Sequence, residues 1–120
     1  MADRVLFISW GEVVRGREVA ALENFNETIG LYGQLQQEGR IESFDVVLLD
    51  PAMDIAGYFE VHGSAEQLNE LKASEDFRRN LASGSLIVDN LKLVDGYTNA
   101  GIAREMEYYQ EAVSKVPQSA

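Results

Sequence analysis

The stretch YFEVHGSAEQL, residues 58–68, decides the fold class. Up to His62, more polar side chains alternate with apolar ones, which is the period-two pattern of a half-buried strand. Ser64 then stands three residues before Gln67, which is the spacing of a capping box at the start of a helix. The stretch therefore predicts a strand that turns directly into a helix, and it contains the only histidine of the chain.

Before the helix that starts at Ser64, the sequence predicts one helix and three strands, the third of which contains the beginning of the quoted stretch. Apolar residues recur at spacings of three and four between Gly16 and Gly39, where the glycine suits the C′ position of a helix. Pro51 stops the strand before the central stretch, because proline cannot donate to a ladder. The predicted strands are Arg4–Trp10, Arg40–Asp50 and Ile55–Gly63. The helical face consists of Leu22, Phe25, Ile29, Tyr32 and Leu35.

Downstream, the sequence predicts a two-piece helix, a fourth strand and a last helix. Ser74 can cap the second piece, SEDFRRNLAS. The run SLIVDNLKLVDGY predicts a strand over Ser85–Tyr97, and the last helix covers about 100–116. This helix has an apolar stripe formed by Ile102, Met106, Tyr109 and Val113.

The order β-α-β-β-α-β followed by an extra helix predicts an α+β, ferredoxin-like fold. Its core is residues 4–97 of a single domain, because 120 residues leave no room for a second. Helices cover one face of a four-stranded antiparallel sheet. The runs VVLL and SLIV are apolar on both faces, as strands buried on both sides are. The uncovered face would expose a large apolar patch, so the sequence predicts a homodimer with the sheets face to face.

Composition limits the possible partners. The formal net charge is −10, which disfavours nucleic acid and anionic membrane surfaces. The absence of cysteine excludes disulfides and thiolate metal sites. We find no signal peptide and no apolar run of membrane-spanning length, so we expect a cytoplasmic protein.

From VLFISW to LKLVDGY the chain resembles the dimeric α+β barrel superfamily. This superfamily includes antibiotic-biosynthesis monooxygenase-like, EthD-like, YCII-like and stress-responsive proteins. The resemblance rests on the element order and on the pattern GYFEVHGSAEQLNEL. It implies a homodimeric barrel, and for some members a cofactor-free oxygenase that binds flat aromatic substrates between sheet and helices.

Two specialised activities of this superfamily fit the sequence poorly. Haem-degrading members use an Asn, Trp and His set with the histidine on a helix, whereas His62 ends a strand here and Trp10 ends another. YCII-like members are associated with a His–Asp pair. Asp50 and Asp54 lie at the far end of the strand from His62, so that pair is not matched.

The candidate catalytic residues are His62, Glu60 and Tyr58, which alternation places on the barrel side of their strand. A buried carboxylate needs a partner, and Lys92 is the candidate for Glu60, with Asn90 on the same face of its strand. One interpretation makes His62 a general base at a pocket mouth. The other makes it a corner residue, and Glu60–Lys92 an ion pair that fixes the dimer register.

The candidate ligand-pocket residues come mainly from the first strand and the first helix. They are Trp10, Phe25, Ile29, Tyr32, Asn90 and Lys92. Trp10 can alternatively close a barrel end. We expect no metal and no cofactor, because the acids are scattered and no phosphate-binding loop is present.

The sequence thus predicts a small homodimeric barrel that binds a small apolar or aromatic ligand without established catalysis. The alternative is a cofactor-independent, monooxygenase-like enzyme with His62 as its acid or base. An enzyme of that class needs a cavity of a few hundred Å³ with convergent polar groups. Filling of the space under the first helix by Phe25, Ile29 and Tyr32 would favour a purely assembling module.

Overall fold

The computed structural model describes residues 1–50 and 54–117 and has the predicted α+β, ferredoxin-like fold. The predicted turn at Pro51 lies outside the described residues. The helices are α1 (Glu18–Gln37), α2 (Ala65–Ala73), α3 (Glu75–Ser85) and α4 (Ala100–Ser114). The strands are β1 (Arg4–Trp10), β2 (Ser43–Leu48), β3 (Gly57–Gly63) and β4 (Lys92–Tyr97).

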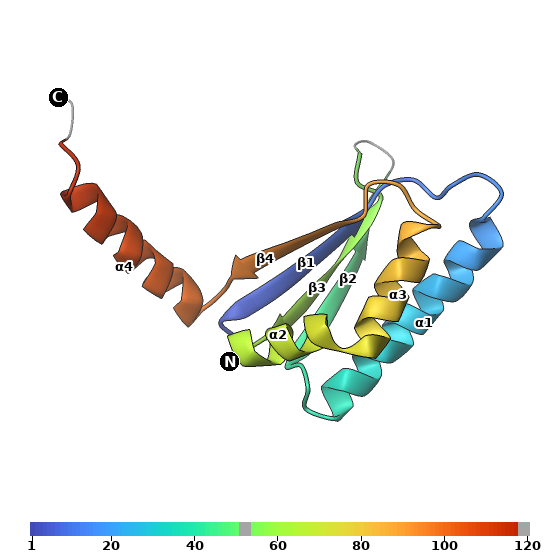
Figure 1. Cartoon of the computed structure of the whole chain (residues 1–120), viewed down its shortest axis with the longest axis horizontal. Coiled ribbons are helices and arrows are strands. Elements are labelled where there is room, and N and C mark those ends of the chain that lie inside the picture. Colours follow the sequence, from blue (N-terminus) through green and yellow to red (C-terminus); the bar gives the residue numbers. More distant parts are fainter. Residues whose placement is uncertain (51–53, 118–120) are drawn as a thin grey trace.

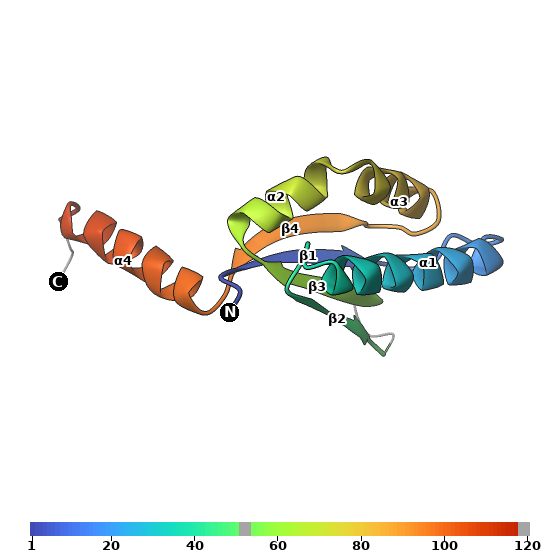
Figure 2. The same cartoon turned by 90° about the horizontal axis from the view of Figure 1, so that it is seen from below.

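The strands form one antiparallel sheet in the order β2-β3-β1-β4. Helices α1, α2 and α3 lie on one side of this sheet (Figures 1 and 2). We call the other side the open face, because no described helix covers it. The protein thus has two layers, and the second face of the sheet has no cover within the chain.

Strand alternation places the hydrophobic core between the sheet and the helices. Leu6 and Ile8 of β1 and Phe59 and Val61 of β3 are buried there. The helices contribute the buried residues Tyr32, Leu35, Leu68, Leu71 and Phe77. The opposite parity of β3 puts Tyr58, Glu60 and His62 on the open face, as the sequence predicts.

The helix ends follow the predicted local chemistry. Ser64 and Gln67 form the capping box of α2, with the Gln67 N–H donating to Ser64 Oγ at 3.1 Å. Gln67 Oε1 accepts the Ser64 N–H at 2.9 Å. Ser74 accepts the N–H of Phe77 and thereby caps α3. Gly39, with a φ of +71°, follows the last turn of α1 in the left-handed region that glycine adopts readily.

Three strands are shorter than predicted, β3 by only its first two residues. β4 begins at Lys92, because α3 continues to Ser85 and the SLIV run then forms the connection rather than a strand. An isolated bridge joins Val88 to Val13, and Asn90 turns the chain with a φ of +55°. β2 begins at Ser43, because the preceding residues complete the end of α1. The Arg40 N–H, for example, donates to the Leu35 carbonyl at 2.9 Å.

Helix α4 projects away from the sheet beyond the end of β4 (Figure 1). Its base is fixed to the start of the chain, because Asn99 Nδ2 donates to the Ala2 carbonyl at 2.6 Å. Arg104 pairs with Asp3 at 3.4 Å. A Cβ on Gly101 would lie only 2.2 Å from the Asp3 carbonyl oxygen, so only glycine permits this approach. Within the described residues, no helix is long and apolar enough to cross a membrane.

Candidate functional site

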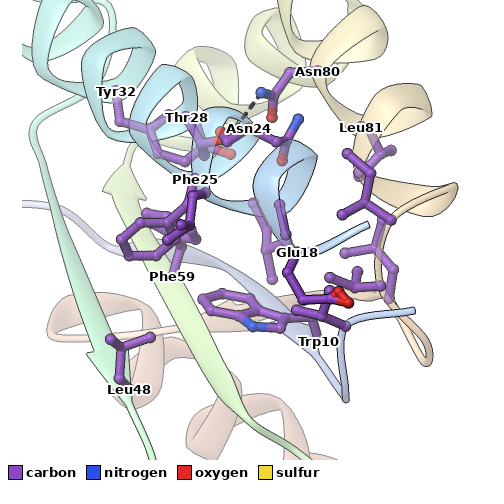
Figure 3. A pocket seen from close by; sticks show the side chains of 18 residues that line it. Trp10, Glu18, Asn24, Phe25, Thr28, Tyr32, Leu48, Phe59, Asn80 and Leu81 are labelled. Carbon is purple, nitrogen blue, oxygen red and sulfur yellow. Dashed lines mark hydrogen bonds between the residues drawn. The ribbon is translucent and has the colours of Figure 1, made fainter. Parts of the chain in front are cut away.

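A cavity of about 470 Å³ lies between the sheet and helices α1 and α3 (Figure 3). Its floor comes from β1, β2 and β3, and one wall comes from α1. The facing wall consists of α3 and the connection to β4, which contributes Ile87, Val88 and Leu91. The SLIV run, predicted as strand, therefore closes the cavity on this side.

Aromatic rings form the inner part of this cavity. Trp10 lies 5.4 Å from Phe59 between ring centroids, and Phe25 meets Trp10 edge to face at 6.1 Å. Tyr32 meets Phe59 edge to face at 5.3 Å. Such tilted and edge-to-face pairs hold rings in defined orientations. The floor is therefore a preformed aromatic surface, suited to a flat apolar molecule.

A small polar group lies on the opposite wall, where α1 meets α3 (Figure 3). Asn80 Nδ2 donates to Thr28 Oγ1 at 2.9 Å, and the Thr28 hydroxyl donates to the Asn24 carbonyl at 2.7 Å. The Thr28 hydroxyl is thus already engaged as donor and acceptor. The Asn24 side-chain amide, which also lines the cavity, forms no hydrogen bond with another described residue. It is one polar group available to a ligand.

The mouth of the cavity is apolar and open to solvent. Leu22 on α1 and Leu48 on β2 line the cavity, and they are 66% and 67% exposed. Glu18 also lines it, but both of its carboxylate oxygens accept the Gly16 N–H, at 2.6 and 3.0 Å. A ligand can therefore enter between α1 and β2 without first displacing a buried side chain.

Tyr32 contributes a neutral phenol to the inner end of the cavity. It is 1% exposed, and this burial raises the pKa of its phenol, because the phenolate would be removed from water. At neutral pH Tyr32 therefore stays protonated and does not act as a base.

The predicted pocket residues divide into two groups. Trp10, Phe25 and Tyr32 line the cavity, whereas Ile29 packs against the buried core and is not part of the lining. Neither Asn90 nor Lys92 belongs to the cavity. The left-handed turn at Asn90 interrupts strand alternation, and Lys92 lies on the open face.

The candidate catalytic residues lie on the open face, with the sheet between them and the cavity. His62 Nε2 lies 3.5 Å from Glu60 Oε2 and 3.4 Å from Asp45 Oδ2 of the neighbouring strand. The His62 side chain is 21% exposed, so it is largely covered but not deep in a pocket. His62 and Glu60 cannot reach a molecule in the cavity of the same chain, nor does Tyr58 on this face line it.

The predicted Glu60–Lys92 ion pair is corrected by the strand order. β1 lies between β3 and β4, so Phe7 separates Glu60 from Val94, the open-face residue level with it. Glu60 pairs with His62 instead. In the described part of the chain, no carboxylate pairs with Lys92.

Asp45 is the main open-face residue that sequence reasoning missed. The β2–β3 register sets it directly across from Glu60, which brings it to His62. Asp45, Glu60 and His62 offer ligand atoms that lie within 4.8 Å of one another, close enough to contact one cation. The short connection between the two strands signals their pairing, but the sequence does not fix which residues pair.

In the cavity, Asn24, Thr28 and Asn80 were also missed. Asn24 and Thr28 lie beside Phe25 on the inner side of α1. The apolar stripe of this helix marks that side in the sequence, so it is a signal that could have identified both residues. Asn80 gives no such signal, because its role depends on how α3 packs against α1.

The solved structures that share this fold include two that cover most of this chain. One, from Bacteroides fragilis NCTC 9343, is a dimeric protein of unknown function with a ferredoxin-like fold; its TM-score is 0.59 at 12% identity. The match covers 79% of this chain and 96% of that one. The other, from Chloroflexus aurantiacus J-10-fl, carries a provisional assignment as an antibiotic biosynthesis monooxygenase. Its TM-score is 0.51 at 17% identity, over 80% of this chain and 93% of that one.

No protein-family model matches the sequence, and no curated protein does. At these identities the structural matches show the ferredoxin-like fold alone.

Proposed function

We propose that this protein is a homodimeric α+β barrel that binds a small apolar or aromatic ligand in the cavity beneath α1. The observation that carries the proposal is the cavity of about 470 Å³, with its aromatic floor and apolar mouth. Its volume falls within the range of small-molecule sites, about 300–1,000 Å³. A purely assembling module would have this space filled.

The polar groups narrow the ligand chemistry. The Asn24 amide can donate up to two hydrogen bonds and accept up to two, whereas the Thr28 hydroxyl is already engaged. Glu18 at the mouth and the net charge of −10 disfavour an anionic ligand. We therefore propose a neutral, flat molecule with a single carbonyl, hydroxyl or amide group positioned toward Asn24.

Filling the cavity tests this proposal. Ala21 lines the cavity on α1, whereas the neighbouring Ala20 is exposed and lies outside the lining. The Ala21→Trp variant should bind the neutral dye N-phenyl-1-naphthylamine at least about tenfold more weakly, because the indole occupies the dye's volume. The matched Ala20→Trp variant should bind the dye like the parent protein, as measured by dye fluorescence.

Equal dye binding by Ala21→Trp and the parent would contradict binding in the cavity. Native mass spectrometry of the purified protein provides a second measurement. A small molecule retained by the parent and Ala20→Trp, but lost from Ala21→Trp, would identify the natural ligand class.

The second candidate function is that of a cofactor-independent oxygenase acting on the molecule in the same cavity. It is favoured by the cavity together with the fold shared with the monooxygenase-assigned structure. In this alternative His62 is not the acid or base within one chain, because it lies across the sheet from the cavity. Consumption of dissolved oxygen in the presence of the identified ligand, abolished in Ala21→Trp, would favour this candidate.

A further inference from the structure

The open face carries its charges in two separate places. Asp45 and Glu60 lie together with His62 on the β2–β3 side. Lys92 lies on β4, the opposite edge strand. Among the open-face residues of the four described strands, Lys92 is the only lysine or arginine. The remaining open-face residues include the apolar side chains of Val5, Phe7, Val47, Tyr58 and Val94.

Lys92 cannot reach the acidic cluster of its own chain. Three inter-strand spacings, about 14 Å, separate β4 from Asp45 on β2, and two, about 9 Å, separate it from Glu60 on β3, which also lies two residues further along the strand. No described carboxylate pairs with Lys92. The two carboxylates share only His62 as a possible cation. Burial of this face in a dimer would leave these charges incompletely compensated, which is costly.

A two-fold axis solves this problem when it runs between the sheets, parallel to the strands. Because β2 and β4 are the outer strands of a four-stranded order, this axis places β4 of each copy over β2 of the other. It also preserves the level along the strands. Through the ladder, Lys92 is level with Val47, two residues from Asp45. That offset is about 7 Å, and stacked sheets lie about 10 Å apart, so a long side chain that leans along the strand can span the gap.

The charge pattern selects this arrangement over the other in-plane two-fold axis. An axis perpendicular to the strands would stack β2 on β2 and β4 on β4. Because this axis reverses the level along the strands, the centrally placed acidic clusters would lie over each other and no lysine would lie over a cluster. Like charges that face each other across an interface are strongly unfavourable.

We infer that the partner's Lys92 completes the Asp45–Glu60–His62 cluster, so that two symmetric cross-subunit ion pairs set the register of the dimer. This inference rests on the homodimer of the proposed function. It adds to that function the orientation of the two sheets and the group that neutralises the cluster.

Charge reversal in separate chains provides the test. Lys92→Glu alone should weaken the dimer at least about tenfold, because two glutamates then face two acidic clusters. Asp45→Lys alone should weaken it similarly. An equimolar mixture of the two variants should form a heterodimer, since both cross-subunit pairs are then restored with opposite polarity. Both residues are exposed in the single chain, so circular dichroism should show folded monomers.

The matched control is Arg78→Glu mixed with Glu66→Lys. These exposed residues lie on helices, and their substitutions change the net charge by the same amounts. Neither control variant should weaken the dimer. Analytical ultracentrifugation gives each dissociation constant, and isotope labelling of one chain identifies heterodimers by native mass spectrometry.

The possible failures are distinct. A parent protein that is monomeric would contradict the homodimer itself. If the parent is a dimer and the charge-reversed variants are weakened but mixing them does not restore a dimer, the inference is overturned while the homodimer stands. The same holds if the single charge reversals have no effect on the dimer. Dissociation of the parent dimer by EDTA, reversed by added Zn²⁺, would show that a metal ion rather than lysine neutralises the cluster, and would also overturn it.

Discussion

At the scale of single residues, Tyr32 shows how burial links the cavity to stability. Its ring packs against Phe59 and Phe44, with centroids 5.3 and 5.7 Å away. Burial raises the pKa of its phenol in the folded protein, whereas an unfolded tyrosine titrates near its ordinary value of about 10. Above that pH the unfolded chain releases a proton that the folded chain retains, so stability falls as pH rises.

The first prediction follows from this difference. Between pH 9 and pH 11 the free energy of unfolding of the parent should fall by about 1 kcal/mol more than that of Tyr32→Phe, which has no phenol to ionise. Urea denaturation at both pH values measures this difference. Tyr108→Phe, at a 54% exposed position on α4, is the matched control and should keep the parental pH dependence. Identical losses in parent and Tyr32→Phe would mean that Tyr32 ionises freely in the fold.

At the scale of elements, α4 is held at its base but uncovered along its length. Asn99, Gly101 and Arg104 tie its start to the first residues of the chain. Beyond that point, Ile102 and Met106 remain 50% and 51% exposed. A fixed helix with an exposed apolar stripe is typical of an arm that packs on another subunit. We therefore expect α4 to contact the second copy of the chain.

Replacing the stripe tests this expectation. The double variant Ile102→Ser with Met106→Ser should weaken the dimer at least about tenfold, because it removes apolar area that the interface buries. The control is Ala103→Ser with Glu107→Ser, which adds the same serines on an adjacent face. Sedimentation equilibrium measures both. The same dissociation constant for both double variants would show that α4 does not contribute to the interface, as would an unchanged dimer after truncation beyond Tyr97.

The elements themselves were largely predictable, because their signals are local. Alternation in β3 and the caps at Ser64 and Ser74 fix a strand and two helix starts without reference to the rest of the chain. The prediction of a strand for the SLIV run was wrong for the opposite reason. Its apolar residues satisfy a strand pattern, but their burial comes from the cavity wall, a tertiary environment that periodicity does not encode.

The candidate site was predictable only where one element supplies it. The apolar stripe of α1 identifies Phe25 and Tyr32, because both face the sheet at helical spacing. Asn80 reaches the cavity through the packing of α3 on α1, and Asp45 reaches His62 through strand register. Contacts between elements depend on a geometry that a single sequence does not specify.

At the scale of the whole molecule, the single chain is less compact than its length predicts. Its radius of gyration is 17.2 Å, whereas a compact domain of this length has about 14 Å. The projecting α4 contributes to this excess (Figure 1). The open face adds partly or fully exposed apolar side chains such as Phe7 and Val94. Both features indicate surfaces that a second copy would cover.

The last prediction is therefore the assembly state. At micromolar concentration, sedimentation velocity should give about twice the 13.3 kDa mass of the chain. Dissociation should expose the open face and α4 together, because we expect one symmetric interface to bury both. Hydrogen exchange measured above and below the dissociation constant should then show joint loss of protection in β2, β4 and α4, with the core at Phe59 and Val61 unchanged. If the protein instead sediments as a single monomeric species at concentrations up to 100 times higher, about 100 μM, the open face stays uncovered in solution. This result would contradict the barrel.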